Sequence, residues 1–236
     1  MHAFICDVAA RLGGRTVSLA DHSIWLVPLL LLLSLWLFDP FSRPLVSKSV
    51  SVNELSSAQR TNICLAAHAI DGTVLAPGAV FSFNARVGPR TVERGYCSAG
   101  TYIGAQTTHS VGGGICCLSS ALYQTVLAGG LVIAERTAHT RPVHTVPPGL
   151  DATVWYGRCD LRFLNSTGNP VMIACRVDRS ALTIQLLSSR FACLPAADSV
   201  HTFVRCRTDE KLLVDVFRTD GNIQQLVSRD LYLLPR

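Results

Sequence analysis

The stretch Gly112-Gly-Gly-Ile-Cys-Cys-Leu-Ser-Ser-Ala-Leu-Tyr-Gln-Thr-Val-Leu-Ala-Gly-Gly130 carries the clearest structural pattern in this sequence. Apolar residues recur every four positions in two rows: Leu118, Leu122 and Val126, then Tyr123, Leu127 and Leu131. Side chains four residues apart lie on the same face of an α-helix, so the spacing predicts a helix over residues 116–131. The glycines that flank the apolar rows are typical of helix boundaries.

Two cysteines begin this predicted helix. Cys116 and Cys117 directly follow Gly112, Gly113, Gly114 and one isoleucine. The positive end of the helix dipole favours a thiolate there and lowers the pKa of a cysteine from its free value of about 8.5. Glycines leave backbone N–H groups exposed, so the same loop could bind an oxyanion. The segment therefore has the features of a nucleophilic cysteine beside an anion site.

Residues that could assist such a thiol follow in chain order. His139 is a candidate base, and Asp151 and Asp160 are candidate carboxylates that would orient it. A structural interpretation stays open beside this one. Cysteines at helix starts are frequently inert core residues, a glycine loop can serve helix packing or cradle an anion, and a single histidine is more often a hydrogen-bonded group of the fold. Asp160 can equally cap the turn before it.

The flanking sequence predicts a second helix and many strands. Helical spacing over residues 55–70, ending at Asp71-Gly72, predicts the helix, and residues 74–91 predict short extended pieces between Pro-Gly and Gly-Pro turns. Short runs rich in branched and aromatic residues predict antiparallel strands farther on. These runs are residues 152–156, 161–164, 171–177, 181–187, 201–207, 212–218 and 225–234. The expected fold class is α+β, with two main helices and an antiparallel, β-rich carboxyl-terminal half.

The amino end contains an uncharged apolar run, residues 23–38, which is typical of a membrane helix. A cleaved signal sequence is the alternative. We favour an uncleaved anchor because the residues after the run lack the small side chains that a signal peptidase needs. Arg11 and Arg15 precede the run, so the positive-inside rule keeps the amino tail in the cytoplasm. Residues from about 45 onward would then lie outside the cytoplasm, on a single-pass protein of the cell membrane.

The expected organisation is therefore a tail, an anchor, a linker, a main domain and a β-rich extension. Their bounds are residues 1–22, 23–38, 39–54, 55–187 and 188–236.

Composition narrows the functional classes. Of the 236 residues, 49% are hydrophobic and 16% charged, which is too apolar for a disordered protein. The formal charge is +5, but the arginines are scattered singly without aromatic interleaving, so no nucleic acid is expected as a partner. An anionic polymer remains a candidate partner. The nine cysteines suit an oxidising compartment and none forms a C-x-x-C pair, so we expect no metal and no cofactor.

A series of motifs follows in fixed order along the chain. They include Gly72-x-Val-Leu-x-Pro-Gly78, Phe81-Ser-Phe-Asn84, Val87-Gly-Pro-Arg-Thr91, Gly112-Gly-Gly-Ile-Cys116, Glu135-Arg136, His139 and Asp151-Ala-Thr-Val154 with Gly157 and Asp160. In order and spacing these motifs resemble the bacterial VanW family, and the resemblance covers about residues 55–187. Cys117 stands where that family usually has glutamine.

The resemblance implies a membrane-anchored protein of the cell envelope that acts on or binds peptidoglycan or its precursors. Residues at the family's polar positions are Cys116, Arg136, His139, Asp151 and Asp160. As an enzyme, the protein would be a cysteine-dependent acyl transferase or peptidase on cell-wall peptides, with Cys116 as nucleophile, His139 as base and either aspartate as its orienting group. The glycine loop would bind the oxyanion.

Two non-catalytic versions stay open. In a binding protein, the glycine loop with Arg90 and Arg136 would hold a peptide carboxylate or a phosphate without turnover. In an assembly protein, the Gly-Gly-Gly-Ile-Cys motif would be structural and the anchor would present a partner surface.

Overall fold

A computed structural model describes residues 41–103, 106–189 and 199–234. The expected tail and membrane helix, residues 1–22 and 23–38, lie outside the described residues. Within the described ranges, the structure contains no helix that is both long and apolar enough to cross a membrane. The fold class agrees with the sequence in its main parts, because two long helices are accompanied by antiparallel strands.

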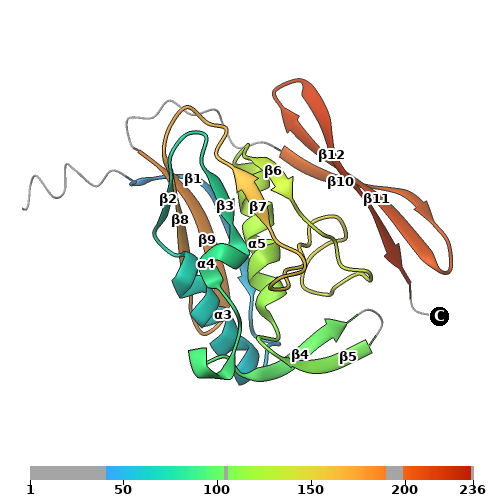
Figure 1. Cartoon of the computed structure of the whole chain (residues 1–236). Helices are drawn as coiled ribbons and strands as arrows, with labels where there is room; N and C mark the ends of the chain where they lie inside the picture. Colours follow the sequence, from blue (N-terminus) through green and yellow to red (C-terminus); the bar gives the residue numbers. More distant parts are fainter. Residues whose placement is uncertain (1–40, 104–105, 190–198, 235–236) are drawn as a thin grey trace, which may run out of the picture. The chain divides into compact units, whose positions relative to one another are not determined.

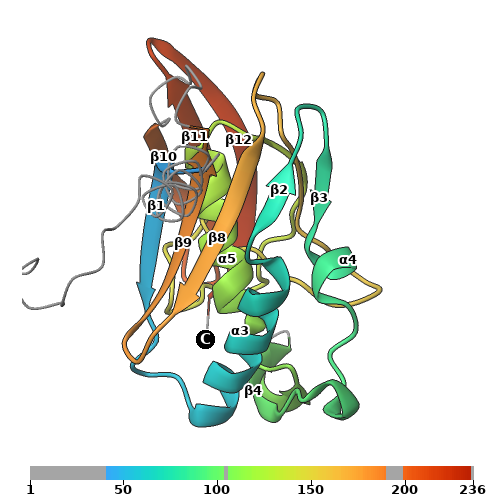
Figure 2. The same ribbon diagram turned by 90° about the vertical axis from the view of Figure 1, so that its left-hand side faces the viewer.

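The two long helices pack against a four-stranded antiparallel sheet (Figures 1 and 2). The helices are α3, Ser57–Ile70, and α5, Ile115–Ala128. The strands, in sheet order, are β1 (Arg43–Ser51), β9 (Ala181–Ser188), β8 (Val171–Val177) and β2 (Thr73–Leu75). Helix α5 contacts β1 and β9, α3 contacts β8, and the helices contact each other, so the main hydrophobic core lies between sheet and helices.

Both predicted helices are confirmed, with ends set by local chemistry. Ser56 caps α3 by accepting from the amide of Gln59 at 3.2 Å, while the Gln59 side chain accepts from the amide of Ser56 at 3.0 Å. Helix α5 ends at Ala128, three residues before the expected end, because Gly129 and Gly130 stop it, the latter at φ +76°.

Smaller elements surround this centre. A second sheet has the order β3 (Val80–Ser82), β7 (Arg162–Leu164), β6 (Val132–Glu135), and β4 (Ser98–Ile103) pairs with β5 (Gln106–Val111) as a hairpin just before α5. Helix α4, Phe83–Val87, and a 3₁₀ turn, Val92–Arg94, lie between β3 and β4. The sequence predicted short extended pieces where α4 lies, and it made no prediction for the residues of the β4–β5 hairpin.

Two expectations about the strands are corrected. Residues 39–54, expected as a linker, contain β1, whose backbone pairs with β9 although its sequence lacks a clear apolar alternation. Residues 152–156 form isolated bridges at Thr153 and Trp155 instead of a strand. The reason is that Ala152 exchanges hydrogen bonds with the hydroxyls of Ser119 and Ser120 on α5, which take the place of a strand neighbour.

The carboxyl-terminal strands form a separate three-stranded antiparallel sheet. Its strands are β10 (Ser199–Arg207), β11 (Lys211–Asp220) and β12 (Ile223–Leu233), paired in that order (Figure 1). Val216 of β11 belongs to the main hydrophobic core, so this sheet is packed onto the domain.

Candidate functional site

Cys116 lies in the first turn of α5, where the sequence placed it. Gly114 is the N-cap with φ +95°, and Gly112 has φ +86°, conformations that favour glycine. A Cβ on Gly113 would lie 2.3 Å from the carbonyl oxygen of Ala99 in β4. The three glycines therefore allow the chain to turn sharply from β5 into α5 while lying directly against β4.

Asn62 of α3 fixes this loop from the other side. Its side-chain amide donates at 2.9 Å to the carbonyl oxygens of both Cys97 and Gly113, and its Oδ1 accepts from the amide of Cys97 at 2.7 Å. The residue is fully buried. Asn62 thus joins α3, the segment before β4 and the glycine loop, although sequence analysis gave it no role.

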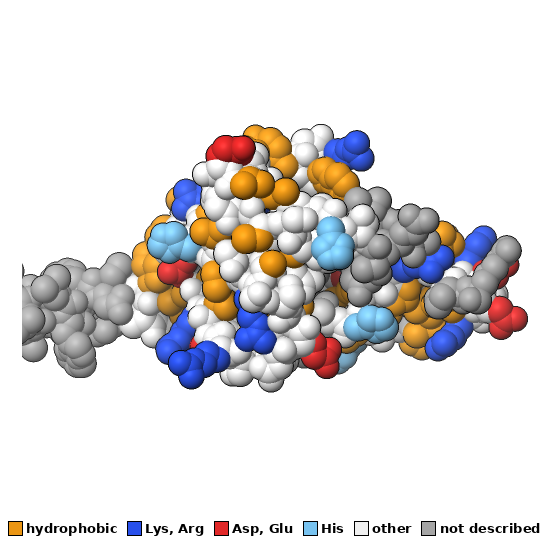
Figure 3. All heavy atoms as spheres, turned by 90° about the horizontal axis from the view of Figure 1, so that it is seen from below, with side chains coloured by type: hydrophobic (Ala, Val, Ile, Leu, Met, Phe, Trp, Pro, Cys, Tyr) orange, Lys and Arg blue, Asp and Glu red, His pale blue; other side chains and the backbone are white. Residues whose placement is uncertain are grey.

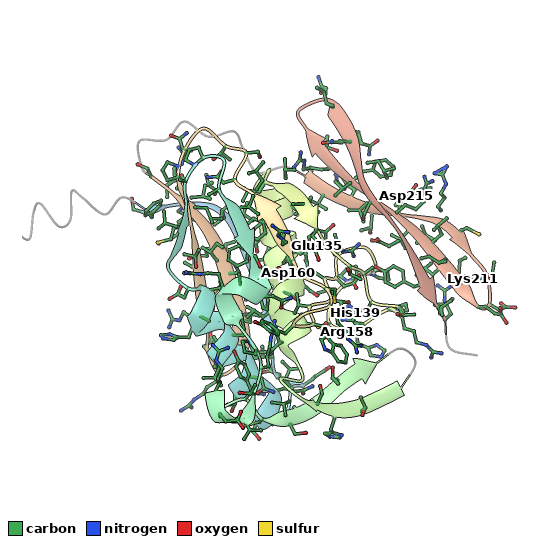
Figure 4. All side chains as sticks on the ribbon, viewed as in Figure 1. Glu135, His139, Arg158, Asp160, Lys211 and Asp215 are labelled. Carbon is green, nitrogen blue, oxygen red and sulfur yellow. The ribbon has the colours of Figure 1, made fainter. Side chains whose placement is uncertain are left out.

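His139 and Asp151 form a close pair beside Cys116. His139 lies in the loop after β6 (Figure 4), and its Nδ1 is 2.6 Å from Oδ2 of Asp151. The backbone amide of His139 donates to the same oxygen at 2.6 Å. The Cys116 thiol donates to the carbonyl oxygen of Val154 at 3.9 Å, and it lies close enough to the imidazole for each group to shift the pKa of the other. With Nδ1 held by Asp151, Nε2 is left for the thiol, which is the arrangement of a nucleophile, a base and an orienting carboxylate.

The electrostatics of the site favour a thiolate. Burial alone would raise the pKa of Cys116, but the hydrogen bond and charge of His139 outweigh it and hold the pKa below its ordinary value. Burial opposes protonation of His139 as well, yet its hydrogen bonds to Asp151 and Cys116 raise its pKa to about 9. One pKa falls and the other rises, so both shifts favour the thiolate–imidazolium form of the pair over the neutral form.

Fewer backbone N–H groups of the glycine loop are available to an anion than the sequence predicted. The amide of Gly112 donates to the carbonyl of Cys97 at 3.0 Å, and that of Gly113 donates to the carbonyl of Ser110 at 3.1 Å. These two N–H groups are therefore used by the fold. Within the described part of the chain, the amides of Gly114 and Cys116 have no acceptor. They are the N–H groups that could face an oxyanion formed at the Cys116 sulfur.

Arg90 lies on the wall of the same cavity as Cys116 and His139. Its Nη1 donates to Oδ1 of Asn84 at 2.7 Å, and its guanidinium lies over the rings of Phe83 and Tyr156, at 5.5 and 5.9 Å from the ring centroids. Its Nη2 is buried and has no hydrogen-bond partner among the described residues. The position fits the predicted role of Arg90 as an anion-binding residue.

Asp160, the other candidate carboxylate, does not contact His139; its hydrogen bonds are to residues at the start of α4 and to Leu161. Its carboxylate accepts from the hydroxyl of Ser82 at 2.5 Å and from the amides of Asn84 and Leu161 at 2.8 Å each. Its own amide donates to Glu135 at 3.0 Å, and the two residues lie near one another in Figure 4. The structure therefore brings Asp151, and not Asp160, to His139, and gives Asp160 contacts that stabilise the start of α4.

Arg136 lies behind the pair rather than in the cavity. Its side chain is 5% exposed, bonds Oδ1 of Asp151 at 3.2 Å and Asp230 at 2.6 Å, and lies 5.0 Å from the ring centroid of Tyr123. The side-chain Nε of Arg136 donates to the backbone carbonyl oxygen of Asp151 at 2.6 Å. These contacts hold Asp151, so the position does not match the predicted role in direct ligand binding.

The cavity has a volume of about 540 Å³, and its lining includes Cys116, His139, Arg90, Trp155 and Tyr156. The two aromatic side chains are 42% and 50% exposed. Figure 3 views the molecule from the side on which β4 and β5 lie, where the Lys and Arg side chains are scattered rather than gathered in one patch. The cavity therefore combines the Arg90 guanidinium and the His139 imidazole with the carboxylate of Glu54 and with aromatic side chains.

The structure also shows the state of the cysteines and whether side chains gather to bind a metal. All seven cysteines in the described ranges are free thiols. Across the same ranges, no group of three or more His, Cys, Asp or Glu is placed to hold a metal ion.

Comparisons with known proteins match the part of the chain that carries Cys116, His139 and Asp151. The family model described as VanW like protein matches residues 58–187. Relatives include the uncharacterized protein YoaR of Bacillus subtilis (strain 168), 43% identical over 137 residues, and the vancomycin B-type resistance protein VanW of Enterococcus faecalis (strain ATCC 700802 / V583), 28% identical over 134 residues. The alignments cover 58% and 55% of this chain but 45% and 49% of the relatives, so the chain spans about half the length of the curated relatives it matches. No solved structure matches.

Proposed function

The chain belongs to the VanW family, and from that premise we propose that it is a cysteine-dependent enzyme of the cell envelope. It transfers or hydrolyses an acyl group of peptidoglycan peptides or their precursors, and the apolar run at residues 23–38 holds it at the membrane. The observation that carries the proposal is that Cys116 and His139 lie together on the wall of a cavity, with the buried Asp151 holding Nδ1 of His139 from behind at 2.6 Å. The name of the Enterococcus relative, a vancomycin resistance protein, supports the choice of the envelope.

The reaction follows from the protonation states. The Cys116 thiolate attacks the carbonyl carbon of a peptide bond, and the amides of Gly114 and Cys116 stabilise the oxyanion that forms. The His139 imidazolium gives its proton to the leaving amine nitrogen as the C–N bond breaks, which leaves a thioester on Cys116. His139 then takes a proton from an acceptor amine or from water. The acceptor attacks the thioester and releases the thiolate.

Asp151 and Arg90 have distinct roles in this scheme. Asp151 is buried and ionised, so it stabilises the imidazolium and fixes the ring without exchanging a proton itself. Arg90 carries an unpartnered Nη2 on the cavity wall and binds a carboxylate of the substrate peptide.

One observation favours a binding protein as the second candidate. Gly112 and Gly113 are explained entirely by packing and main-chain hydrogen bonds, and Arg90 alone suffices to hold an anion. A binding protein would retain its affinity for a muropeptide in Cys116→Ser, whereas the enzyme would lose turnover in the same variant.

The deciding experiment is the pH dependence of alkylation at each cysteine of the full chain, read by mass spectrometry. We expect Cys116 to react with an apparent pKa clearly below about 8.5, and His139→Ala to raise it. Cys117 and Cys175 are internal controls, because burial raises their pKa values to about 11 and about 12. A Cys116 that titrates like a free thiol, or stays protected, would exclude the enzyme and leave the binding protein to be tested.

A further inference from the structure

We infer that the carboxyl-terminal sheet, which lies beyond the residues matched by the family model, completes the site by supplying Tyr232 as a positioning residue for Asp151 and His139. The inference rests on the proposed function for its catalytic meaning. Its structural content stands on contacts alone: the family-matched domain provides the nucleophile, base and carboxylate, and β12 provides the group that fixes the carboxylate.

The contact between Tyr232 and Asp151 is short and buried. The phenol hydroxyl donates to Oδ1 of Asp151 at 2.5 Å, and it accepts from the amide of Gly149 at 2.6 Å. Tyr232 is fully buried and Asp151 is 1% exposed. Neither residue can therefore exchange this bond for one to bulk water.

A second residue of β12 acts one step farther back. Asp230, two positions before Tyr232, holds the guanidinium of Arg136 at 2.6 Å, and Arg136 bonds Oδ1 of Asp151 at 3.2 Å. Burial disfavours the charge of Arg136, but its hydrogen bond to Asp230 keeps its pKa above the ordinary value. Both donors to Oδ1 of Asp151 are thus held by, or belong to, the same strand.

The sheet also fixes the two loops that carry the pair. The amide of Leu233 donates at 2.8 Å to the carbonyl of Thr140, the residue after His139. Gly149 has φ +91°, and a Cβ there would lie 2.7 Å from Val216 of β11. The loop before Asp151 therefore packs closely against this sheet, and both ends of the His139–Asp151 hydrogen bond depend on it.

This arrangement divides the two oxygens of Asp151 between two tasks. Oδ2 accepts from the ring and the amide of His139, while Oδ1 accepts from Tyr232 and Arg136. A carboxylate held at both oxygens cannot rotate about its Cβ–Cγ bond, so the imidazole keeps the orientation that brings it to Cys116. Without the Tyr232 hydroxyl, Oδ1 keeps only the 3.2 Å bond from Arg136, so the carboxylate is held less firmly in the orientation that stabilises the imidazolium.

The test is a proton NMR titration of His139 in the full chain, with its signal assigned by comparison with His139→Gln. In the wild type we expect an apparent pKa near 9. Tyr232→Phe keeps the ring and removes the hydroxyl, and should move this pKa toward 6.5 while circular dichroism still shows a folded protein. Asp230→Asn should shift it in the same direction by a smaller amount.

The matched control is Thr208→Val in the turn between β10 and β11. The Thr208 hydroxyl accepts from the amides of Glu210 and Lys211, so its loss disturbs this turn of the carboxyl-terminal sheet without touching Asp151. The control should leave the His139 pKa unchanged. A wild-type His139 that titrates near 6.5, or a Tyr232→Phe pKa that equals or exceeds the wild-type value, would overturn the inference. Failure of the proposed function appears separately, as an ordinary alkylation profile of Cys116 in the wild type.

Discussion

At the scale of single residues, the site is defined by which groups face the His139 ring. Cys116 meets it from α5, and Asp151 meets it from the loop that precedes Ala152. Asp160 stood at an equally plausible place in the sequence, but its carboxylate is used by Ser82 and the amides at the start of α4. Substitution of Asp151 should therefore change the pH dependence of the proposed reaction, whereas substitution of Asp160 should not.

Asp151→Asn should move the alkaline limit of turnover. The imidazolium of His139 must protonate the leaving amine, so kcat/KM for a muropeptide should fall above pH 9 in the wild type, where that proton is lost. An amide stabilises the imidazolium less than a carboxylate does. In Asp151→Asn, the pH above which kcat/KM falls should therefore shift from about 9 toward 6.5, and the maximal kcat should drop. Thiol alkylation needs no proton donor and should show no falling limb.

Asp160→Asn is the comparison for that profile. It weakens the hydrogen bonds that the carboxylate accepts from the capping residue Ser82 and from the amide of Asn84, so it should lower the melting temperature while the pH at which activity falls stays near 9. If Asp160→Asn shifted this pH and Asp151→Asn did not, Asp160 would be the orienting carboxylate.

At the scale of elements, the start of α5 depends on α3. The Asn62 side chain bonds Cys97 through its amide and its carbonyl, and bonds the carbonyl of Gly113 as well. No water replaces these bonds easily, because Asn62 is fully buried. The position of Cys116 at the start of α5 thus depends on one polar side chain of the neighbouring helix.

Asn62→Ala should lower the free energy of unfolding by roughly 2 to 3 kcal/mol, because it leaves buried backbone groups without partners. Urea unfolding followed by circular dichroism measures the loss. Thr61→Ala on the exposed side of the same helix removes a hydroxyl bonded to Ser57 and should cost about 0.5 kcal/mol or less. Equal losses in the two variants would contradict the assigned role of Asn62.

At the scale of the whole described molecule, the carboxyl-terminal sheet and the family-matched domain form one site. Tyr232, Asp230 and Leu233 lie on the sheet, and their partners Asp151, Arg136 and Thr140 lie on the domain. Gly149 of the domain lies directly against the side chains of this sheet, because a Cβ there would lie 2.7 Å from a methyl carbon of Val216 in β11.

Gly149→Ala should loosen this contact. The new methyl group would meet Val216 at 2.7 Å, in a backbone conformation that L residues rarely adopt, so we expect a cost of about 1 to 3 kcal/mol. Limited proteolysis should then cut the carboxyl-terminal sheet faster than in the wild type. Gly168→Ala is the control, since a Cβ there meets nothing within 4 Å. Equal cleavage rates in both variants would show that the sheet does not depend on this approach.

The sequence by itself determined the local features: the two helices, the thiol at the start of α5, and the order of Cys116, His139 and Asp151. These depend on residue spacing and on the chemistry of single residues, which a sequence displays directly. It also predicted strands at residues 171–177 and 181–187, where branched residues are dense and the structure has β8 and β9.

Only the tertiary structure decided which aspartate orients His139, which amides of the glycine loop stay free, and that Tyr232 and Asp230 belong to the site. Tyr232 lies 81 positions from Asp151 in the chain, and nothing in the local pattern of β12 distinguishes its hydroxyl from any other. Strand β1 likewise exists because β9 offers its backbone groups, since its own polar sequence predicts none. Such contacts are fixed by the packing of distant segments, and their physical cause is therefore absent from any short stretch of sequence.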